Sequence, residues 1–577
     1  MMKTFCNPVN LEYRFCIRGR KGTIAPFREG ADPGAVLWHD KYWLVTSKGA
    51  GVHWSTDLVN WHCVHDNILP YEGYAPDLIV YQGKLLYLVG ISDTTVFEAV
   101  DPERGLWKPY GEPWNLADPK LFADDDGRMY MYHGCSPDGP IYGAEVDTET
   151  ILPKTDWLEL LYADPQVHGW ERNGENNIPG FDFLREQNEA FGHTSVKPDK
   201  YVPWNEGVFL NKHNGKYYLQ NSTAGTSYNV YTDAISISDS PLGPFTFQKD
   251  NPFSLKPGGF ITGAGHSCDM ADKYGNLFHF STMRIAKRFI FERRVGMFPA
   301  GFMDNGEMYC KQRFGDFPHY IPEQKFSYDD DFFTGWMLLS YGAAVQASSA
   351  ALPAENAVDE NIRTQWAAEK DDPAPTLTVD LGSVMTVRAV QINFSEQDCC
   401  QYAFDGPGGA YRYLLEGSAD GDNWITLADQ RKNTEDKTHQ YHDLETEQSL
   451  RFVRLTVNSI PAGGAAAVSG LRVFGSDGSG APCPPENFKA VRSAEDPVKV
   501  TVSWTMPENA YGVNVRWGVA PDRLHHCWQT LKTSELTFSS LDAACNAYYI
   551  ALESFGRGGV SPLTEIICLK KQTVQTV

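Results

Sequence analysis

The chain has 577 residues, of which 42% are hydrophobic, 13% aromatic and 21% charged. This composition is typical of a folded chain with several domains and excludes extensive disorder. The formal net charge of −23 disfavours contact with nucleic-acid phosphates and anionic membrane surfaces, so we expect no nucleic-acid partner.

No apolar window is long enough to span a bilayer, and we expect no membrane insertion. The first residues, MMKTFCNPVNLEYRFC, lack the apolar core of a signal peptide. The sequence as written therefore predicts a cytoplasmic protein. Removal of a leader would instead make the protein secreted or periplasmic, and the sequence leaves both options open.

A turn followed by an aromatic, β-type run recurs along the first 320 residues, and each copy predicts a β-hairpin. The copies are HDKYWLV (39–45), YQGKLLYLV (81–89), DDDGRMYMY (124–132), HNGKYYLQ (213–220) and YGNLFHF (274–280). Five repeats predict a five-bladed β-propeller over residues 1–322, because closing a ring of sheets removes their exposed edges. MDNGEMYC (303–310) predicts a further hairpin that closes the ring by pairing with N-terminal sequence.

A short polar triad precedes each repeated turn by five to nine residues. The triads are Ala31-Asp32-Pro33, Ala75-Pro76-Asp77, Ala117-Asp118-Pro119, Asn205-Glu206-Gly207 and Gly265-His266-Ser267. We expect each triad to open the innermost strand of a blade, with a polar residue at the mouth of a central funnel. The polar insertion 164–204 between the third and fourth repeats is predicted to wall the same pocket.

Two further units follow, and the predicted fold class is all-β throughout. Alternating strands predict a β-sandwich over residues 336–476, and a second sandwich over 483–570 follows a Gly/Ser/Pro-rich linker. No chemistry is evident in the last unit, for which a spacer or docking role is expected.

Asp32, Asp118 and Glu206 occupy matching triads in three repeats, so a radial arrangement would bring their carboxyl groups into one funnel. Crowded, partly buried carboxyls shift one another's pKa values, and one can remain protonated near neutral pH. An acid and a base that flank one bond with room for a water are the groups of inverting glycoside hydrolysis. Flat rings that would pack on sugar faces are supplied by Trp54, Tyr74, Trp114 and Trp204, with inter-blade packing as the alternative.

At these motifs the sequence resembles glycoside hydrolase family 43, the five-bladed propeller hydrolases of arabinose- and xylose-containing glycans. The resemblance covers roughly residues 1–320 and rests on ADPGAVLWHDKYWLVTS (31–47), ADPKLFADDDGRMYMY (117–132) and NEGVFLNKHNGKYYLQNS (205–222). It implies that Asp32 is the general base, that Glu206 is the general acid, and that Asp118 raises the pKa of that acid and orients it.

The resemblance also implies roles for two other residues. Arg284 matches an arginine near the sugar, and its alternative is an ion pair with one of the site acids. His266 matches a histidine on the propeller axis, which either holds a structural calcium ion through water or is a core residue. No cofactor is required for the reaction that the resemblance implies.

Residues 336–476 resemble the discoidin, or factor V/VIII C-type, sandwich of many carbohydrate-binding modules, and residues 483–570 resemble a fibronectin type III sandwich. Trp366 is expected in the core of the first. The function predicted is an inverting glycosidase, similar to α-L-arabinofuranosidases and β-xylosidases, acting on an oligosaccharide or polysaccharide. The alternatives are a galactan-active member of the family and a non-catalytic glycan-binding propeller.

Overall fold

The computed structural model describes residues 2–20, 23–91, 94–137, 139–179, 203–399 and 409–571. Within these ranges the chain is all-β, as predicted, and its helices are short 3-10 turns: η1 (Pro102–Arg104), η2 (Gly169–Glu171), η3 (Glu175–Asn177), η4 (Ala354–Ala357) and η6 (Pro461–Gly463). None of the helices in these ranges is long and apolar enough to cross a membrane.

The first 310 residues form five four-stranded antiparallel sheets, each built from strands consecutive in the described sequence. The first sheet contains β4 (Ala31–Trp38), β5 (Lys41–Ser47), β6 (Val52–Ser55) and β7 (His62–Val64). The second contains β8 (Tyr74–Tyr81), β9 (Lys84–Gly90), β10 (Thr94–Asp101) and β11 (Leu106–Trp114). The third contains β12 (Lys120–Ala123), β13 (Met129–His133), β14 (Ile141–Val146) and β15 (Leu158–Leu161).

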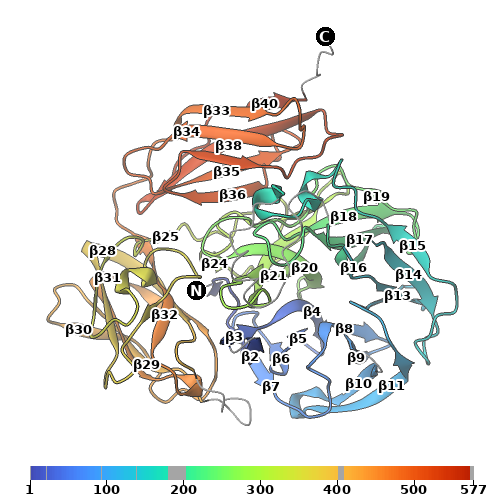
Figure 1. Cartoon of the computed structure of the whole chain (residues 1–577), viewed down its shortest axis with the longest axis horizontal. Helices are drawn as coiled ribbons and strands as arrows, with labels where there is room; N and C mark the ends of the chain where they lie inside the picture. Colours follow the sequence, from blue (N-terminus) through green and yellow to red (C-terminus); the bar gives the residue numbers. More distant parts are fainter. Residues whose placement is uncertain are drawn as a thin grey trace.

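The fourth sheet contains β16 (Glu206–His213), β17 (Lys216–Thr223), β18 (Thr232–Ser238) and β19 (Thr246–Phe247). The fifth contains β20 (Thr262–Ala271), β21 (Leu277–Arg284), β22 (Arg293–Phe302) and β23 (Met308–Cys310). The opening strands touch in ring order, since β4 contacts β8, β8 contacts β12, β12 contacts β16, β16 contacts β20, and β20 contacts β4 (Figure 1). The triads at the heads of these strands therefore lie around one axis.

Tight turns explain why the repeated motifs fold as hairpins. His39 and Asp40 both have positive φ between β4 and β5, and so do Gln82-Gly83 and Asn214-Gly215 at the matching places in the second and fourth sheets. Two-residue turns with positive φ match the twist of the strands that they join, and Gly, Asn and Asp tolerate them best. Apolar residues that alternate along each hairpin then pack between neighbouring sheets, as Leu44 and Phe280 do.

The predicted closure by residues 303–310 is wrong. Those residues span the turn between β22 and β23, so they complete the fifth sheet rather than add a hairpin. The N-terminal strand β1 (Thr4–Phe5) pairs instead with β24 (His319–Tyr320), and β2 (Arg14–Arg20) pairs with β3 (Thr23–Glu29) in a separate hairpin. The partner of the N-terminal strand thus lies in the connecting segment after the fifth sheet. A search for repeated hairpins could not find this partner, because β24 is not part of a hairpin repeat.

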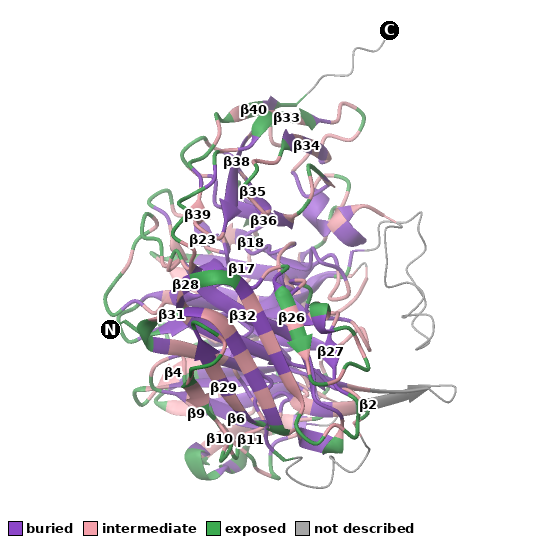
Figure 2. Ribbon diagram, turned by 90° about the vertical axis from the view of Figure 1, so that its left-hand side faces the viewer, coloured by how far each residue is buried: buried purple, intermediate pink, exposed green. Residues whose placement is uncertain are grey.

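The middle unit is one eight-stranded sheet, ordered β25-β32-β28-β31-β29-β30, with β26 paired to β28 and β27 to β32. Its strands are β25 (Met337–Leu338), β26 (Ala344–Ala347), β27 (Trp366–Ala367), β28 (Thr376–Phe394), β29 (Arg412–Ser418), β30 (Trp424–Asp429), β31 (His439–Ser459) and β32 (Ala467–Ser476). β32 is buried along nearly its whole length (Figure 2). Trp366 is fully buried in the core of this unit, as expected.

The C-terminal unit is a sandwich of two sheets, ordered β33-β34-β37 and β36-β35-β38-β39, with β40 paired to β38. Its strands are β33 (Glu486–Arg492), β34 (Val500–Thr505), β35 (Gly512–Gly518), β36 (His526–Leu531), β37 (Glu535–Phe538), β38 (Ala547–Gly556), β39 (Gly559–Val560) and β40 (Ile567–Lys570). Trp504 and Tyr548 lie in its core.

The three units share a buried seam. Phe314, Phe317, Leu338, Phe474 and Phe555, drawn from all three units, form one apolar cluster. Polar contacts cross it as well, because Arg472 of the middle unit donates to the carbonyl of Asp316 at 2.6 Å. Apolar burial on this scale stabilises the packed arrangement by the hydrophobic effect.

Candidate active site

A left-handed residue lies in or just before the opening strand of each sheet, and these five residues mark the site. Asp32, Ala75, Asp118, Gly207 and His266 have φ values of 48°, 48°, 50°, 62° and 46°. The strand register shifts at this point in four of the five sheets. A bulge of this kind bends the strand and redirects its side chain, and non-glycine residues held there cost of the order of 1–3 kcal/mol. Four of these five residues are not glycine, so the heads of the opening strands are positions of backbone strain.

This alignment corrects the expected equivalence of the three carboxylates. Asp32 and Asp118 are structurally equivalent, but the residue that matches them in the fourth sheet is Gly207, and Glu206 lies one position earlier. A Cβ on Gly207 would lie 2.2 Å from the Ser222 hydroxyl, so only glycine fits there. Glu206 nevertheless reaches the site with its longer side chain. All three carboxylates are buried, with exposed fractions of 3% for Asp32, 7% for Asp118 and 8% for Glu206.

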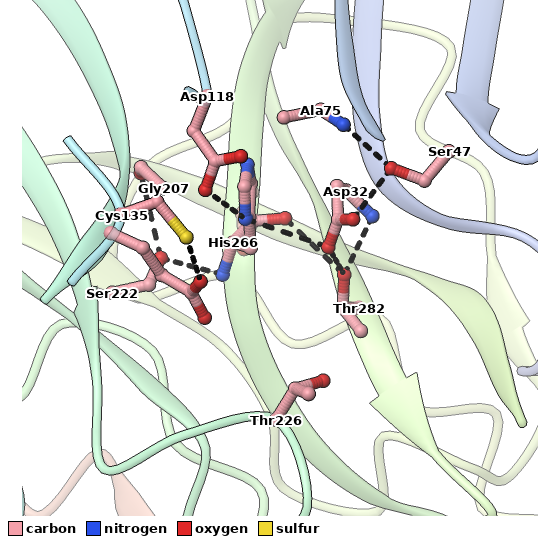
Figure 3. Close-up of polar contacts among 12 residues, drawn as sticks. Asp32, Ser47, Ala75, Asp118, Cys135, Gly207, Ser222, Thr226, His266 and Thr282 are labelled. Carbon is pink, nitrogen blue, oxygen red and sulfur yellow. Dashed lines mark hydrogen bonds and ion pairs between the residues drawn. The ribbon is translucent and has the colours of Figure 1, made fainter. Parts of the chain in front are cut away.

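Asp32 is held as an anion. One carboxylate oxygen accepts from the Ser47 hydroxyl at 2.6 Å, and the other lies 3.1 Å from Nη1 of Arg293 and 3.2 Å from the Thr282 hydroxyl (Figure 3). Burial alone would raise the pKa of Asp32, but the Arg293 guanidinium, His266 and these hydroxyl donors outweigh it and hold that pKa below its ordinary range. The group can therefore accept a proton but stays charged at neutral pH.

The pKa of Glu206 is shifted in the opposite direction from that of Asp32. Burial, with the negative charge of Asp32, raises the pKa of Glu206 to about 7, although a 2.5 Å hydrogen bond from the Tyr231 hydroxyl opposes the shift. The Cys135 thiol lies 3.3 Å from the other carboxylate oxygen. Burial also raises the pKa of Asp118, and the charges of Glu206 and Asp32 add to that effect. Burial thus favours the protonated forms of both Glu206 and Asp118.

His266 lies among these acids. Its Nδ1 is 3.5 Å from Asp32 and 3.8 Å from Asp118, and burial lowers its pKa to about 4, so the ring is neutral (Figure 3). Lys120, which is paired with Asp77 at 3.1 Å, is close enough for its charge to lower that pKa further. Calcium takes six to eight oxygen ligands. Asp118, Glu206 and His266 form a group whose donor atoms could hold a metal ion, and a calcium ion held by His266 through water stays a prediction.

The four predicted aromatic residues divide into two pairs. Trp204 donates its indole N–H to the Cys135 sulfur at 3.3 Å and so lies beside Glu206, and it is 39% exposed. Tyr74 begins β8 next to the left-handed Ala75, with the Lys48 ammonium 4.6 Å from its ring centre. Both therefore lie close to the site.

Trp54 and Trp114 do not lie at the heads of opening strands. Trp54 is on β6, the third strand of its sheet, where its ring contacts that of His62 in a tilted arrangement, with 4.5 Å between ring centres. Trp114 ends the outermost strand of the second sheet, and both indoles pack against inter-sheet apolar clusters. The structure thus places Trp54 and Trp114 in the apolar layers between sheets instead of at the expected sugar-binding site.

The arginine that contacts Asp32 is Arg293, which the sequence did not single out. Arg284 instead pairs with Glu175 and donates to the Ser227 carbonyl at 2.7 Å. The two arginines are register partners on β21 and β22, and Nη2 of Arg293 also pairs with Glu29 at 3.0 Å. The sequence FERRVGMF (291–298) contains two adjacent arginines, Arg293 and Arg294, and the sequence alone does not show which of them contacts Asp32. Neighbouring side chains of a strand point to opposite faces, so in β22 only Arg293 reaches Asp32.

The described part of the predicted insertion, residues 164–179, packs against the C-terminal sandwich (Figure 1). The Gly169 amide donates to the Leu541 carbonyl at 2.8 Å, and the Ser540 hydroxyl donates to Asn177 at 2.5 Å. Glu175, in the same segment, holds Arg284 and accepts from the Asn229 amide at 3.1 Å. The C-terminal unit therefore supports the segment beside the site and is more than a spacer. Residues 180–202 of the insertion lie outside the described ranges.

Comparison with known proteins identifies two families along the chain. The family model described as glycosyl hydrolases family 43 matches residues 26–306, and the F5/8 type C domain model matches residues 342–471. Residues 26–306 form a glycoside hydrolase family 43 domain. The middle unit contains an F5/8 type C, or discoidin-like, domain, as the sequence predicted.

Several curated proteins resemble the family 43 domain. A xylosidase/arabinosidase 43A of Humicola insolens is 29% identical over 197 residues, covering 30% of this chain and 56% of that protein. A β-xylosidase of Xylanibacter ruminicola is 27% identical over 30% of this chain and 54% of its own length. A solved thermostable family-43 glycoside hydrolase shows 21% identity, a TM-score of 0.40 and coverage of 53% of this chain and 96% of its own. The chain thus spans about half the length of these curated relatives.

A buried charged triad lies behind the acids of the family 43 domain. The His279 ring lies between Asp269, at 2.8 Å, and Asp233, at 3.4 Å. Burial favours a neutral ring, but the two carboxylates outweigh it and raise the pKa of His279 to about 9. Asp233 in turn accepts from the Ser222 hydroxyl at 2.5 Å and from the His266 amide at 3.0 Å. The imidazolium therefore fixes the backbone that carries His266.

Replacing His279 with Gln should destabilise the fold in a pH-dependent manner. The pKa rises from an ordinary 6.5 to about 9 on folding, so the stabilisation is complete below pH 6.5 and is lost as the pH rises through 9. Removing one partner of a buried ion pair costs about 3–5 kcal/mol. Denaturant unfolding at several pH values should show a large loss of stability near pH 6 and a smaller one above pH 9. A loss independent of pH would contradict a charged His279.

Proposed function

We propose that this protein is an inverting glycosidase that releases arabinose or xylose from oligosaccharides or polysaccharides. Asp32 is the general base that activates a water molecule, and Glu206 is the general acid that protonates the leaving oxygen. The observation that carries the proposal is the opposite environment of two buried carboxyls: Arg293 lowers the pKa of Asp32, whereas burial raises that of Glu206 to about 7. Carboxyls whose pKa values are driven apart in this way are typical of acid–base pairs.

The hydrogen bonds suit these two roles. Tyr231 donates to Oε1 of Glu206, so the transferable proton belongs on Oε2, which faces the Cys135 thiol. Ser47 and Thr282 orient the Asp32 carboxylate, and Arg293 keeps it ionised. General acid–base catalysis of this kind contributes about 10²–10⁴-fold to a rate.

Asp118 is proposed as a positioning residue for the acid. Its oxygen, one from Glu206 and one nitrogen of His266 lie within 4.8 Å of one another. Like charges at this distance disfavour joint ionisation, so the loss of a proton from one of these two carboxyls helps the other to keep its own. Among the predicted sugar contacts, Trp204 and Tyr74 keep that role in the proposal. Arg284 enters it as the residue that anchors Glu175 beside the site.

The five sheets are proposed as the blades of a five-bladed β-propeller within a catalytic unit of residues 1–322. Contacts between their opening strands in ring order support this arrangement. The middle unit is proposed to span residues 336–476. The unit at 483–570 is proposed to be a fibronectin type III-like sandwich, because its strands divide into two facing antiparallel sheets.

A hydrolysis screen tests the proposed activity. Aryl α-L-arabinofuranoside, aryl β-D-xyloside and aryl β-D-galactoside are incubated with the protein and, in parallel, with the Asp32→Ala variant. We expect release from a pentoside that disappears in the variant, and proton NMR of the first sugar product should show inverted anomeric configuration. A retained configuration would contradict the roles given to Asp32 and Glu206.

Two alternatives give different results in the same screen. A galactan-active enzyme would cleave only the galactoside. A glycan-binding protein without activity would cleave none of the three and would also leave natural polysaccharides intact while binding them. The buried acid–base pair favours hydrolysis, since a binding protein needs no proton donor opposite a base.

The pH dependence of kcat/KM tests the assignment of the acid. Activity should fall as Glu206 loses its proton near pH 7, and the Tyr231 hydrogen bond stabilises the charged form of that group. Tyr231→Phe should therefore move the alkaline limb to higher pH while lowering the maximum by less than about tenfold. A pH–rate profile of both proteins checks this, and an unchanged alkaline limb would contradict Glu206 as the acid.

A further inference from the structure

A second cluster of metal-ligating side chains lies at the boundary between the catalytic unit and the C-terminal sandwich. Asp250 follows β19 of the fourth sheet, whereas His525 and His526 lie at the start of β36. Nε2 of His526 is 3.1 Å from one Asp250 oxygen, and Nε2 of His525 is 3.8 Å from the other. The exposed fractions of the side chains are 0% for Asp250, 6% for His525 and 3% for His526.

Two buried atoms of this cluster have no hydrogen-bond partner among the described residues. They are Oδ2 of Asp250 and Nε2 of His525, which face each other across the 3.8 Å separation. An unsatisfied buried polar group costs about 1–3 kcal/mol. A cation between the three side chains would satisfy both atoms at once.

The donor set and its spacing suit one class of metal. Ligand bonds of 2.0–2.1 Å in a tetrahedral zinc site place neighbouring donor atoms about 3.4 Å apart. The separations of 3.1 and 3.8 Å run from the two histidines to the two different oxygens of Asp250. One donor atom from each of the three residues lies within 4.8 Å of the other two, which is compatible with a shared ion. Two imidazoles and one carboxylate suit Zn²⁺ and similar late transition metals, whereas Ca²⁺ and Mg²⁺ prefer oxygen ligands.

The nearby cations have carboxylate partners of their own. Arg516 and Arg523 are close enough for their charges to lower the pKa of His525. Arg523 pairs with Glu307 at 3.2 Å, and Arg516 lies 3.9 Å from Glu553. Their repulsion of a bound divalent ion is therefore reduced.

A cavity opens beside His525. It has a volume of about 250 Å³, and its lining includes His525, Tyr328, Asp329, Asp331 and Asp522. Its lining carries the three acids and also three cationic side chains, Lys311, Arg313 and Arg516, so the charges of its wall balance. The cavity also leaves room for a water molecule in the fourth coordination position.

We propose that Asp250, His525 and His526 form a binding site for one Zn²⁺-class ion, with water as the fourth ligand, which joins the catalytic unit to the C-terminal sandwich. The ligands come from two units, so metal binding is coupled to their docking. Through the contacts of residues 164–179 with that sandwich, the ion also stabilises the segment beside the proposed active site.

Zinc titration of the full-length protein tests this proposal. After dialysis against a chelator and then buffer, we expect calorimetry to detect about one Zn²⁺ per chain with micromolar or tighter affinity, together with a rise in Tm. His525→Gln should abolish both signals. The matched control is His65→Gln, because Glu12, Cys63 and His65 form another group able to hold an ion, and this control should still bind one equivalent.

Cobalt provides a readout that does not depend on the variants folding. Co²⁺ added to the wild-type protein should give the intense visible d–d absorption of tetrahedral coordination, and Zn²⁺ should displace it. Absence of binding and of any Tm shift in the wild-type protein would overturn the proposal. Binding that persists in His525→Gln would also overturn it, and would assign the ion to the His65 group or to the cluster of Asp118, Glu206 and His266.

Discussion

Glu206→Gln is expected to lower kcat/KM by at least about 10³-fold on glycosides with poor leaving groups, because the amide cannot donate the proton that departs with the leaving oxygen. The effect should shrink as the leaving group improves. An aryl glycoside with a strongly acidic phenol needs little protonation, so its hydrolysis should fall far less.

A series of aryl glycosides with graded phenol pKa values measures this dependence. The slope of log kcat/KM against leaving-group pKa should be shallow for the wild-type protein and steep for the variant. The fold should be preserved, since Gln keeps the volume of Glu and can still accept the Tyr231 hydrogen bond. Equal losses across the series would assign Glu206 a role other than proton donation.

Asp32→Asn is expected to lower kcat about 10³-fold or more on every substrate, whatever its leaving group. Asparagine cannot take a proton from water, and the Arg293 guanidinium would lose its charged partner on that side. In the plot of log kcat/KM against leaving-group pKa, the line for this variant should therefore lie below that of the wild-type protein and have the same slope. The two variants together separate base from acid, and exchanged patterns would reverse the assignment.

Matched stability measurements keep these two results interpretable. Arg293 retains Glu29 as a partner at 3.0 Å in the Asp32→Asn variant, so the guanidinium is not left uncompensated. Denaturant unfolding of both variants should remain cooperative, with a smaller change than that expected for His279→Gln. A collapse of stability would mean that the loss of rate reflects unfolding.

The sequence was sufficient to predict an all-β chain, the family 43 domain and the discoidin-like domain, because each repeat carries its own turn and its own alternating strand. Asp32 and Asp118 were visible for the same reason, since each Asp-Pro pair lies at the head of the first strand of its sheet. The exact position of Glu206 could not be predicted, because the left-handed residue in the fourth sheet is Gly207, one position after Glu206.

Contacts between distant strands left no local signal. Arg293 is 261 positions from Asp32, and Tyr231 and Cys135 approach Glu206 from two other segments. Nothing in the spacing of these residues indicates that they meet. Similarly, Trp54 and Trp114 resemble Trp204 in the sequence, and only the position of each strand within its sheet separates packing residues from those at the site.

The docking of residues 164–179 on the C-terminal sandwich bears on how this architecture can be recombined. An isolated catalytic module ending near residue 322 would retain Glu175 and Arg284 but lose the Leu541 and Ser540 contacts that hold their segment. A fusion of such a fragment to a foreign binding module would still lack the contacts of the C-terminal sandwich with residues 164–179. The first and last units should therefore be kept together in protein engineering. Because the middle unit lies between them in the sequence, the smallest segment that gene shuffling could transfer intact contains all three.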